Sequence, residues 1–165
     1  MSQNLLSEIF SLSAELVETS RAQGKTIATA ESCTGGLIGA AITATPGSSS
    51  IFYGGIIAYH NAVKIGQLGV KPETIETYGA VSQRVAEEMA LGCRTRLNVD
   101  AVISVTGIAG PGGGSIEKPV GTVWIGLATH NSVSAKIYNF SDMSRNKVRD
   151  FTCLEALKTL IDAVS

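Results

Sequence analysis

Apolar residues recur at helical spacing in three long stretches of the chain. Near the start, the spacing of three and four positions continues until Gly24, which supplies a stop. Ser82 is a suitable N-cap for a second stripe, which ends at Leu97. The third stripe begins at Val148 and closes the chain. The pattern therefore predicts three long helices, the first over residues 4–22.

Strands are predicted where β-branched and apolar residues alternate or form short runs. A Gly54-Gly55 pair within one of these runs indicates a bulge or a close approach of two backbones. The last two runs meet around His130-Asn131, which favours an antiparallel hairpin. The predicted strands are residues 26–30, 52–59, 101–106, 120–129 and 134–140, with shorter helical patterns at residues 37–42, 61–68 and 72–78.

Helices alternate with strands through most of the chain, and a hairpin comes late. This order predicts an α/β fold, layered α/β/α, with a mixed, mainly parallel sheet that ends in the antiparallel hairpin. The 165 residues are 44% hydrophobic, which is enough to bury one core. Since no repeat or linker interrupts the pattern, we predict a single domain over residues 1–165.

Charge and composition exclude several classes of function. Lys and Arg number 13 against 14 Asp and Glu, without a basic run, so a nucleic-acid partner is not expected. Neither a membrane-spanning run nor a signal peptide is recognisable, so we expect a cytoplasmic protein without membrane contact. Three scattered cysteines without C-x-x-C and two isolated histidines favour a reducing compartment and predict neither disulfides nor a metal site.

The sharpest local signal is AESCTGG at residues 30–36, where a strand end turns into a helix. Free N–H groups and the positive end of the helix dipole favour a developing oxyanion or a phosphate there. The alternative is that Ser32 or Thr34 only caps the helix, and the spacing leaves both readings open. Cys33 is a second nucleophile type, but no histidine lies near it in sequence to activate it.

Lys64 closes a polar cluster, YHNAVK, that follows the strand pattern of residues 52–59. A lysine acts as a general base where burial lowers its pKa towards the working pH. The alternative is an ordinary solvated lysine on a helix.

Glycine makes up six of the fifteen residues from Gly107 to Gly121, so this segment is predicted to be a loop. Its many backbone N–H groups suit an anion, although it matches neither the P-loop nor the dinucleotide-binding spacing. A purely structural loop is the alternative. Arg145 and Arg149 lie four residues apart at the start of the last helix, on one face. The sequence leaves open whether they bind a phosphate or lie in solvent.

Five segments together resemble the CinA carboxy-terminal domain family, and they span nearly the whole chain in the same order as in that family. The family includes stand-alone nicotinamide mononucleotide amidohydrolases. The resemblance therefore implies hydrolysis of the carboxamide of nicotinamide mononucleotide to nicotinic acid mononucleotide and ammonia, in pyridine nucleotide recycling. It implies no activity of the amino-terminal domain of longer CinA proteins. The segments are AESCTGG at 30–36, YHNAVK at 59–64, GAVS at 79–82, TGIAGPGGG at 106–114 and KPVGTVW at 118–124.

The same resemblance implies Ser32 as the nucleophile and Lys64 as the base, with no metal or organic cofactor. Tyr59 is a third catalytic candidate. His60 stands where the family commonly has serine, so no role for a hydroxyl is carried over. Arg145 or the Gly-rich loop is expected to hold the 5′-phosphate. The residues expected to contact the substrate are Thr34, Gly35, Gly36, Ser48, Asn61, Thr106, Gly107, Gly110 and Arg145.

Two alternatives remain. A nucleotide-binding module without catalysis would use the same helix end and glycine loop. An amidase for another small amide would use Ser48 of the PGSSS segment as the nucleophile. The expected partner is a small-molecule nucleotide substrate; the oligomeric state is open, with a homodimer favoured. The preference among nicotinamide mononucleotide, nicotinamide riboside and nicotinamide is also open.

Overall fold

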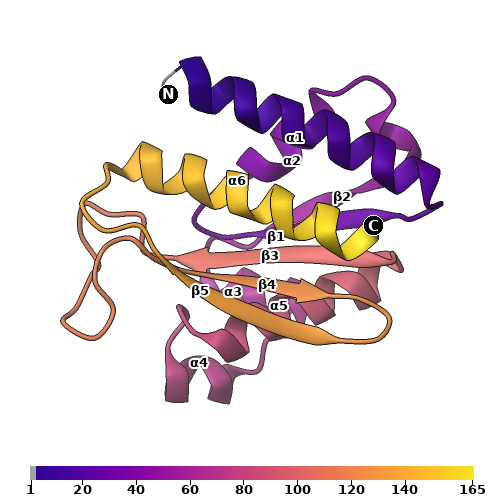
Figure 1. The fold of residues 1–165 in the computed structure, drawn as a ribbon. Helices are drawn as coiled ribbons and strands as arrows, with labels where there is room; N and C mark the ends of the chain where they lie inside the picture. The colour runs from indigo at the N-terminus through magenta and orange to yellow at the C-terminus, as the bar shows by residue number, and fades with distance from the viewer. Residues whose placement is uncertain (1–2) are drawn as a thin grey trace.

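Five strands form one sheet between two layers of helices in the computed structural model, which describes residues 3–165 (Figure 1). The order across the sheet is β2-β1-β3-β4-β5. The first three strands are parallel, whereas β4 is antiparallel to both β3 and β5. The predicted α/β fold with a mixed sheet and a closing hairpin is thus confirmed. The strands are β1 (Ile27–Glu31), β2 (Phe52–Ile57), β3 (Ala101–Gly107), β4 (Thr122–Ala128) and β5 (Val133–Asn139).

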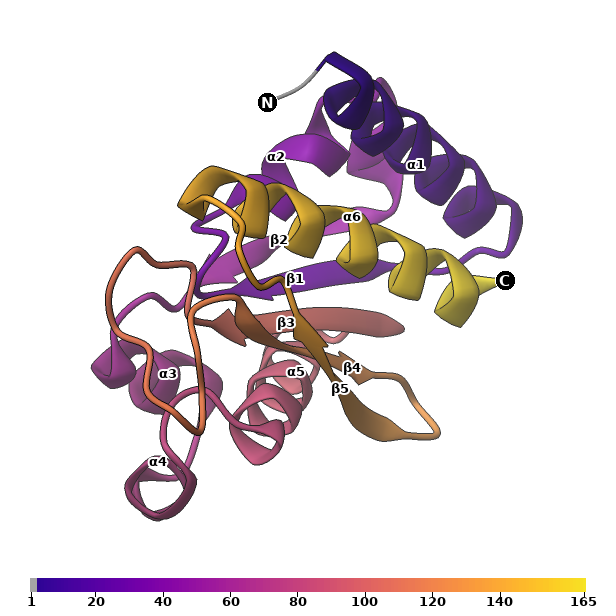
Figure 2. The same ribbon diagram turned by 60° about the vertical axis from the view of Figure 1, so that its left-hand side comes forward.

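The two helix layers pack on separate cores because successive residues of a strand face opposite sides of the sheet. Ile27 of β1 joins the core under α1, α2 and α6, whereas Ala28 joins the core under α3 and α5. Figure 2 shows the two layers on either side of the sheet. The helices are α1 (Gln3–Ala22), α2 (Leu37–Thr43), α3 (Asn61–Leu68), α4 (Pro72–Tyr78), α5 (Gln83–Leu97) and α6 (Arg145–Val164), with a short 3-10 helix, η1 (Ser48–Ser50), before β2.

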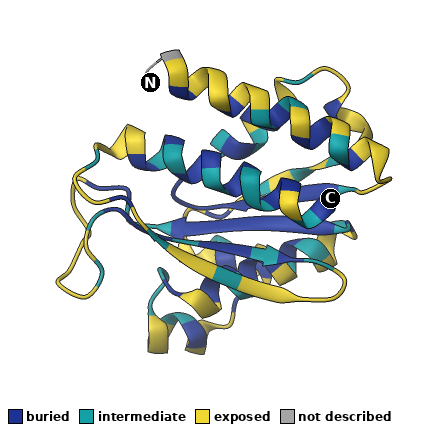
Figure 3. Cartoon of the chain, in the orientation of Figure 1, coloured by how far each residue is buried: buried dark blue, intermediate teal, exposed yellow. Residues whose placement is uncertain are grey.

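β1 is buried along its whole length and β3 up to its last residue, whereas the outer strand β5 is largely exposed (Figure 3). β1 and β3 are covered by helices on both faces, which is why their sequences are short apolar runs rather than alternating patterns. No helix within residues 3–165 combines the length and the apolar character needed to cross a membrane.

Several local predictions are confirmed, and one predicted strand ends earlier in the structure. The pairing of β1 with β2 skips Tyr53, which is the predicted bulge. A Cβ atom on Gly55 would lie 2.2 Å from Thr29 Oγ1, so the glycine leaves room for the threonine hydroxyl of the paired strand. Ser82 caps α5 through the N–H of Val85. The strand predicted to Tyr59 ends at Ile57 in the structure, because the chain turns there into α3.

Candidate active site

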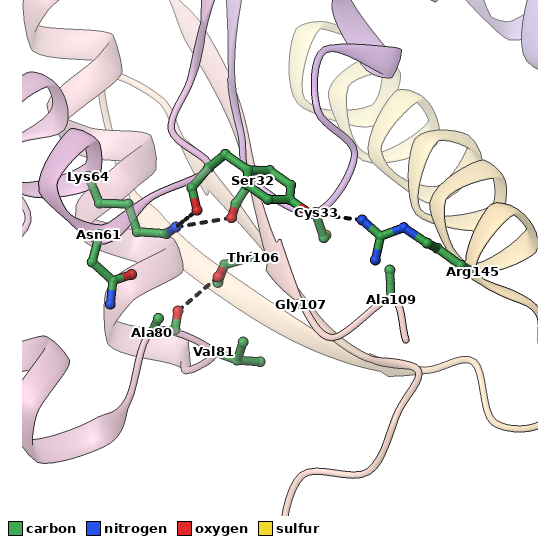
Figure 4. A pocket seen from close by; sticks show the side chains of 11 residues that line it. Ser32, Cys33, Asn61, Lys64, Ala80, Val81, Thr106, Gly107, Ala109 and Arg145 are labelled. Carbon is green, nitrogen blue, oxygen red and sulfur yellow. Dashed lines mark hydrogen bonds between the residues drawn. The ribbon is translucent and has the colours of Figure 1, made fainter. Parts of the chain in front are cut away.

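Parallel strands deliver the site residues to one edge of the sheet. Ser32 directly follows β1, Lys64 lies in the helix after β2, and Thr106 lies at the end of β3. Because these three strands are parallel, the segments after them meet beyond their carboxyl ends. They surround a cavity of about 240 Å³ (Figure 4). Its lining residues are Ser32, Cys33, Tyr59, Asn61, Lys64, Ala80, Val81, Thr106, Gly107, Ala109 and Arg145.

Lys64 and Ser32 are in direct contact in this cavity. Lys64 Nζ lies 3.0 Å from Ser32 Oγ, and it also donates to the carbonyl oxygens of Ala58 at 2.8 Å and Tyr59 at 3.3 Å. Only 2% of the lysine is exposed. Burial lowers the pKa of Lys64, because the ammonium ion loses its water, while charge on the Cys33 thiol acts in the opposite direction. The surface-lysine alternative is therefore wrong.

The position of Lys64 depends on how α3 sits on α5. His60 caps α3, with Nδ1 accepting from the N–H of Ala62. Leu68, at the end of α3, is buried in the core that it shares with α5. The two helices approach so closely that a Cβ atom on Gly92 would lie 1.7 Å from the carbonyl oxygen of Leu68. A helix fixed at both ends in this way holds Lys64 towards Ser32.

The cap of α2 is Glu31, a residue to which the sequence assigned no role. Its buried carboxylate accepts hydrogen bonds from Thr34 Oγ1 and from three N–H groups at the start of the helix, those of Gly36, Ile38 and Gly39. Neither Ser32 nor Thr34 caps the helix, so that alternative is wrong. The Ser32 hydroxyl is thereby left to face the cavity and Lys64.

Two backbone N–H groups that were predicted to contact the substrate, those of Gly35 and Gly36, form hydrogen bonds within the turn instead. The N–H of Gly35 donates to the carbonyl of Ser32 at 3.0 Å, and that of Gly36 donates to Glu31 at 2.9 Å. The N–H groups of Cys33 and Thr34, by contrast, donate to no oxygen within residues 3–165 and have only the Cys33 sulfur, a weak acceptor, beside them. Thr34, Gly35 and Gly36 do not line the cavity, whereas Cys33 does.

The Cys33 thiol lines the same cavity. Burial raises its pKa to about 12, and the negative charge of Glu31 adds to this rise. Hydrogen bonding from the backbone of Cys33 and Thr34 and the charge of Lys64 act in the opposite direction. Since the thiolate is the nucleophilic form of cysteine, a thiol this hard to ionise is a poor nucleophile at neutral pH.

Arg145 and Tyr59 lie at the mouth of the cavity. Arg145 donates from Nη2 to the Tyr59 hydroxyl at 2.8 Å and from Nη1 to the carbonyl of Gly110 at 2.7 Å. Gly110 does not line the cavity, but its carbonyl holds Arg145 in place. Arg149, one turn further along α6, donates instead to the carbonyl of Thr34 and stands behind the serine turn. Arg145 is therefore the arginine that a ligand in this cavity would meet.

Ser48 is not part of this site. It lies in η1, before the first residue of β2, whereas Ser32 follows the last residue of β1. Since the two strands are parallel, the two serines lie at opposite ends of the sheet, roughly 15–20 Å apart at about 3.3 Å per residue. The structure gives no support to Ser48 as a competing nucleophile or a substrate contact.

Three lining residues were not anticipated from the sequence, namely Ala80, Val81 and Ala109. They shape the cavity walls and carry no reactive group. Thr106 connects two of these walls, because its hydroxyl donates to the carbonyl of Ala80 at 2.8 Å. Within residues 3–165, no three side chains among His, Cys, Asp and Glu come together as metal ligands would.

The chain is similar to known proteins along nearly its whole length. The family model of the CinA C-terminal domain matches residues 9–164. A CinA-like protein of Synechocystis sp. is 54% identical over 142 residues, or 85% of this chain and 34% of that protein. A CinA-like protein of Trichormus variabilis is 49% identical over 152 residues, or 91% and 36%. The chain thus spans about a third of the length of these relatives.

Solved structures share the fold. The competence/damage inducible protein CihA from Agrobacterium tumefaciens superposes with a TM-score of 0.93 at 40% identity, over 96% of each chain. A competence-damaged protein (CinA) superfamily protein from Escherichia coli gives a TM-score of 0.88 at 32% identity, over 92% of this chain and 88% of that one. From its sequence match and its fold, the chain belongs to the CinA C-terminal domain family.

Proposed function

We propose that this protein is an amidohydrolase that converts nicotinamide mononucleotide to nicotinic acid mononucleotide and ammonia. The observation that supports this most is the 3.0 Å contact between Lys64 Nζ and Ser32 Oγ in a cavity at the carboxyl ends of parallel strands. A buried lysine whose pKa is lowered, in contact with a serine hydroxyl, is the arrangement that nucleophilic catalysis without histidine requires.

The geometry around Lys64 suits a base. In its neutral form the amine has two N–H groups and one lone pair in tetrahedral directions. The carbonyls of Ala58 and Tyr59 accept the two N–H groups, so the lone pair is left for the proton of the Ser32 hydroxyl. Lys64 is then oriented to remove that proton.

The reaction proceeds in two halves. Lys64 takes the proton of Ser32, and the serine oxygen forms a bond to the carboxamide carbon. The C–N bond then breaks, the nitrogen takes the proton from the Lys64 ammonium, and ammonia leaves an acyl ester on Ser32. In the second half, water gives a proton to Lys64 and attacks the ester; the bond from the carbonyl carbon to the Ser32 oxygen then breaks, and the Lys64 ammonium returns the proton to that oxygen as the acid leaves.

The N–H groups of Cys33 and Thr34 are the donors for the negative charge that develops on the carboxamide oxygen. Neither donates to an oxygen within residues 3–165, both follow the proposed nucleophile, and Cys33 lines the cavity. Each such donor contributes roughly 3 kcal/mol to stabilisation of the transition state in comparable hydrolases. Both halves of the reaction use the same donors, because each passes through a tetrahedral oxyanion.

Arg145 is the group proposed to bind the 5′-phosphate. Its guanidinium lies at the mouth of the cavity and presents charged N–H donors, which pair well with phosphate oxygens. The ring of Tyr59, which is 58% exposed, lies beside it and offers a face to the positively charged pyridinium ring. Together they favour a nucleotide that carries both a phosphate and a pyridinium ring over an uncharged amide.

Ammonia release from nicotinamide mononucleotide, nicotinamide riboside and nicotinamide tests the proposal. We expect turnover of the mononucleotide and its loss in Ser32→Ala, with Ser48→Ala as the matched control that keeps activity. Ammonia release from only one of the other two amides would show that this amide, rather than nicotinamide mononucleotide, is the substrate. Binding of the mononucleotide without release from any amide would make the protein a nucleotide-binding module.

A further inference from the structure

We propose that Glu31 is a positioning residue for the reaction, which rests on the function proposed above. Its carboxylate fixes the turn after β1 so that the N–H groups of Cys33 and Thr34 form the oxyanion hole. Glu31 itself contacts neither the cavity nor, in this proposal, the substrate. It acts through the backbone of the turn that it holds.

The carboxylate is anchored on both sides. Its backbone belongs to β1, between Ile57 of β2 and Val105 of β3, and its carbonyl accepts from the N–H of Ala58 at 2.7 Å. Its side chain is 1% exposed and pairs with no Lys, Arg or His within residues 3–165. Hydrogen bonds from the next turn of chain therefore compensate its burial.

Those hydrogen bonds divide unevenly between the two carboxylate oxygens. Oε2 accepts from Thr34 Oγ1 at 2.7 Å, Gly36 N at 2.9 Å and Ile38 N at 3.1 Å, and Oε1 accepts from Gly39 N at 2.8 Å. All four partners are donors, so both oxygens must act as acceptors. A glutamine would turn an NH₂ group towards a donor at one of these places.

Glu31 fixes the orientation of the oxyanion donors by holding the chain on either side of them. The N–H of Ser32 is held by the carbonyl of Val105 at 3.0 Å, which fixes the start of the turn. The hydroxyl of Thr34 and the N–H of Gly36 are held by Glu31, which fixes its end. Of the amides between these supports, those of Cys33 and Thr34 donate to no oxygen within residues 3–165.

The test compares nicotinamide mononucleotide with its thioamide analogue in wild type, Glu31→Gln and Thr34→Val. Sulfur is a weak hydrogen-bond acceptor, so an oxyanion hole favours the amide over the thioamide. We expect kcat for the amide to fall about tenfold or more in Glu31→Gln with KM little changed, since one displaced donor accounts for up to about 10²–10³. The amide-to-thioamide ratio of kcat/KM should fall with it.

Glu88→Gln is the matched control, because Glu88 caps α4 in the same way, accepting from the N–H of Lys71 and from Thr74 Oγ1. It should leave the ratio at the wild-type value. Thr34→Val removes one donor to Glu31 and keeps the shape of the side chain, so it tests the proposal even where Glu31→Gln does not fold.

The outcomes are distinct. A lower ratio in Glu31→Gln or Thr34→Val, together with a wild-type ratio in Glu88→Gln, supports the proposal. An active wild type whose ratio is unchanged in both site variants overturns it and leaves the proposed function standing. A wild type that releases no ammonia from the amide rejects the proposed function, and this inference with it.

Discussion

Lys64 is the residue whose chemistry depends most on its surroundings. Three oxygen atoms surround its amine, and almost none of the side chain is exposed. Burial lowers the pKa of the amine, so the neutral form becomes available at a lower pH than for a lysine in water. The same three contacts serve either protonation state, which allows the proton to move without rearrangement of the side chain.

Lys64→Arg distinguishes a base from a charge. Arginine keeps the positive charge but does not give up its proton in this pH range. Turnover should therefore fall by about a hundredfold or more, the usual scale for loss of a general base, while substrate affinity measured by calorimetry changes little. Near-normal turnover in Lys64→Arg would show that the lysine serves only as a charge.

Lys64→Met tests the lowered pKa through stability. In the unfolded chain the lysine has its ordinary pKa of about 10.5, so between the lowered folded value and 10.5 the unfolded state binds more protons. Stability of the wild type, relative to Lys64→Met, should therefore rise with pH in that window and be lowest below it. Urea unfolding at several pH values measures the difference, and a difference independent of pH would contradict the shift.

Cys33 and Ser32 are adjacent in the cavity, and we expect opposite results from replacing them. The pKa of about 12 keeps the thiol protonated at neutral pH, so Cys33→Ala should retain substantial ammonia release. Ser32→Ala should release none above background. The reverse ranking would make the protein a cysteine hydrolase.

At the scale of elements, the packing of α3 on α5 positions Lys64, the proposed base. The two helices pack where Gly92 leaves room for the carbonyl of Leu68, one turn beyond Lys64. Since helices are stiff, a displacement at Leu68 is passed on to Lys64. A residue well outside the cavity therefore influences the contact between Lys64 and Ser32.

Gly92→Ala and Gly66→Ala make a matched pair for this link. A Cβ atom at Gly92 would meet backbone at 1.7 Å, whereas nothing lies within 4 Å of one at Gly66 on the exposed side of α3. Gly92→Ala should lower stability by about 1–3 kcal/mol and reduce turnover, because α3 must move away. Gly66→Ala should raise stability by up to about 1 kcal/mol and leave turnover unchanged. Chemical unfolding and ammonia release measure both, and equal behaviour of the two variants would refute the link.

At the scale of the whole molecule, the hydrophobic pattern predicted the layers, whereas the pairing of Ser32 with Lys64 was implied by the resemblance to the CinA family. Buried runs become inner strands, and parallel strands present their carboxyl ends at one edge. The sequence did not indicate at which end of the sheet Ser48 would lie. In the structure it precedes β2 rather than following it. The side chain of Glu31 turns back onto the start of α2, and this contact depends on the conformation of one turn. Ala80 and Ala109 form cavity walls through their shape alone, and neither carries a reactive group that would mark it in a sequence.

The proposed nucleophile and the proposed base come from segments that pack on opposite faces of the sheet. Ser32 leads into α2, which packs with α1 and α6, and Lys64 belongs to α3, which packs with α5. A molecule bound between them would cross-link the layers, so binding and folding are thermodynamically coupled. At a hundredfold excess over Kd, such a ligand would add about 2.7 kcal/mol to the free energy of unfolding. It should slow amide hydrogen exchange in α2 and α3 together, even though these helices share no core.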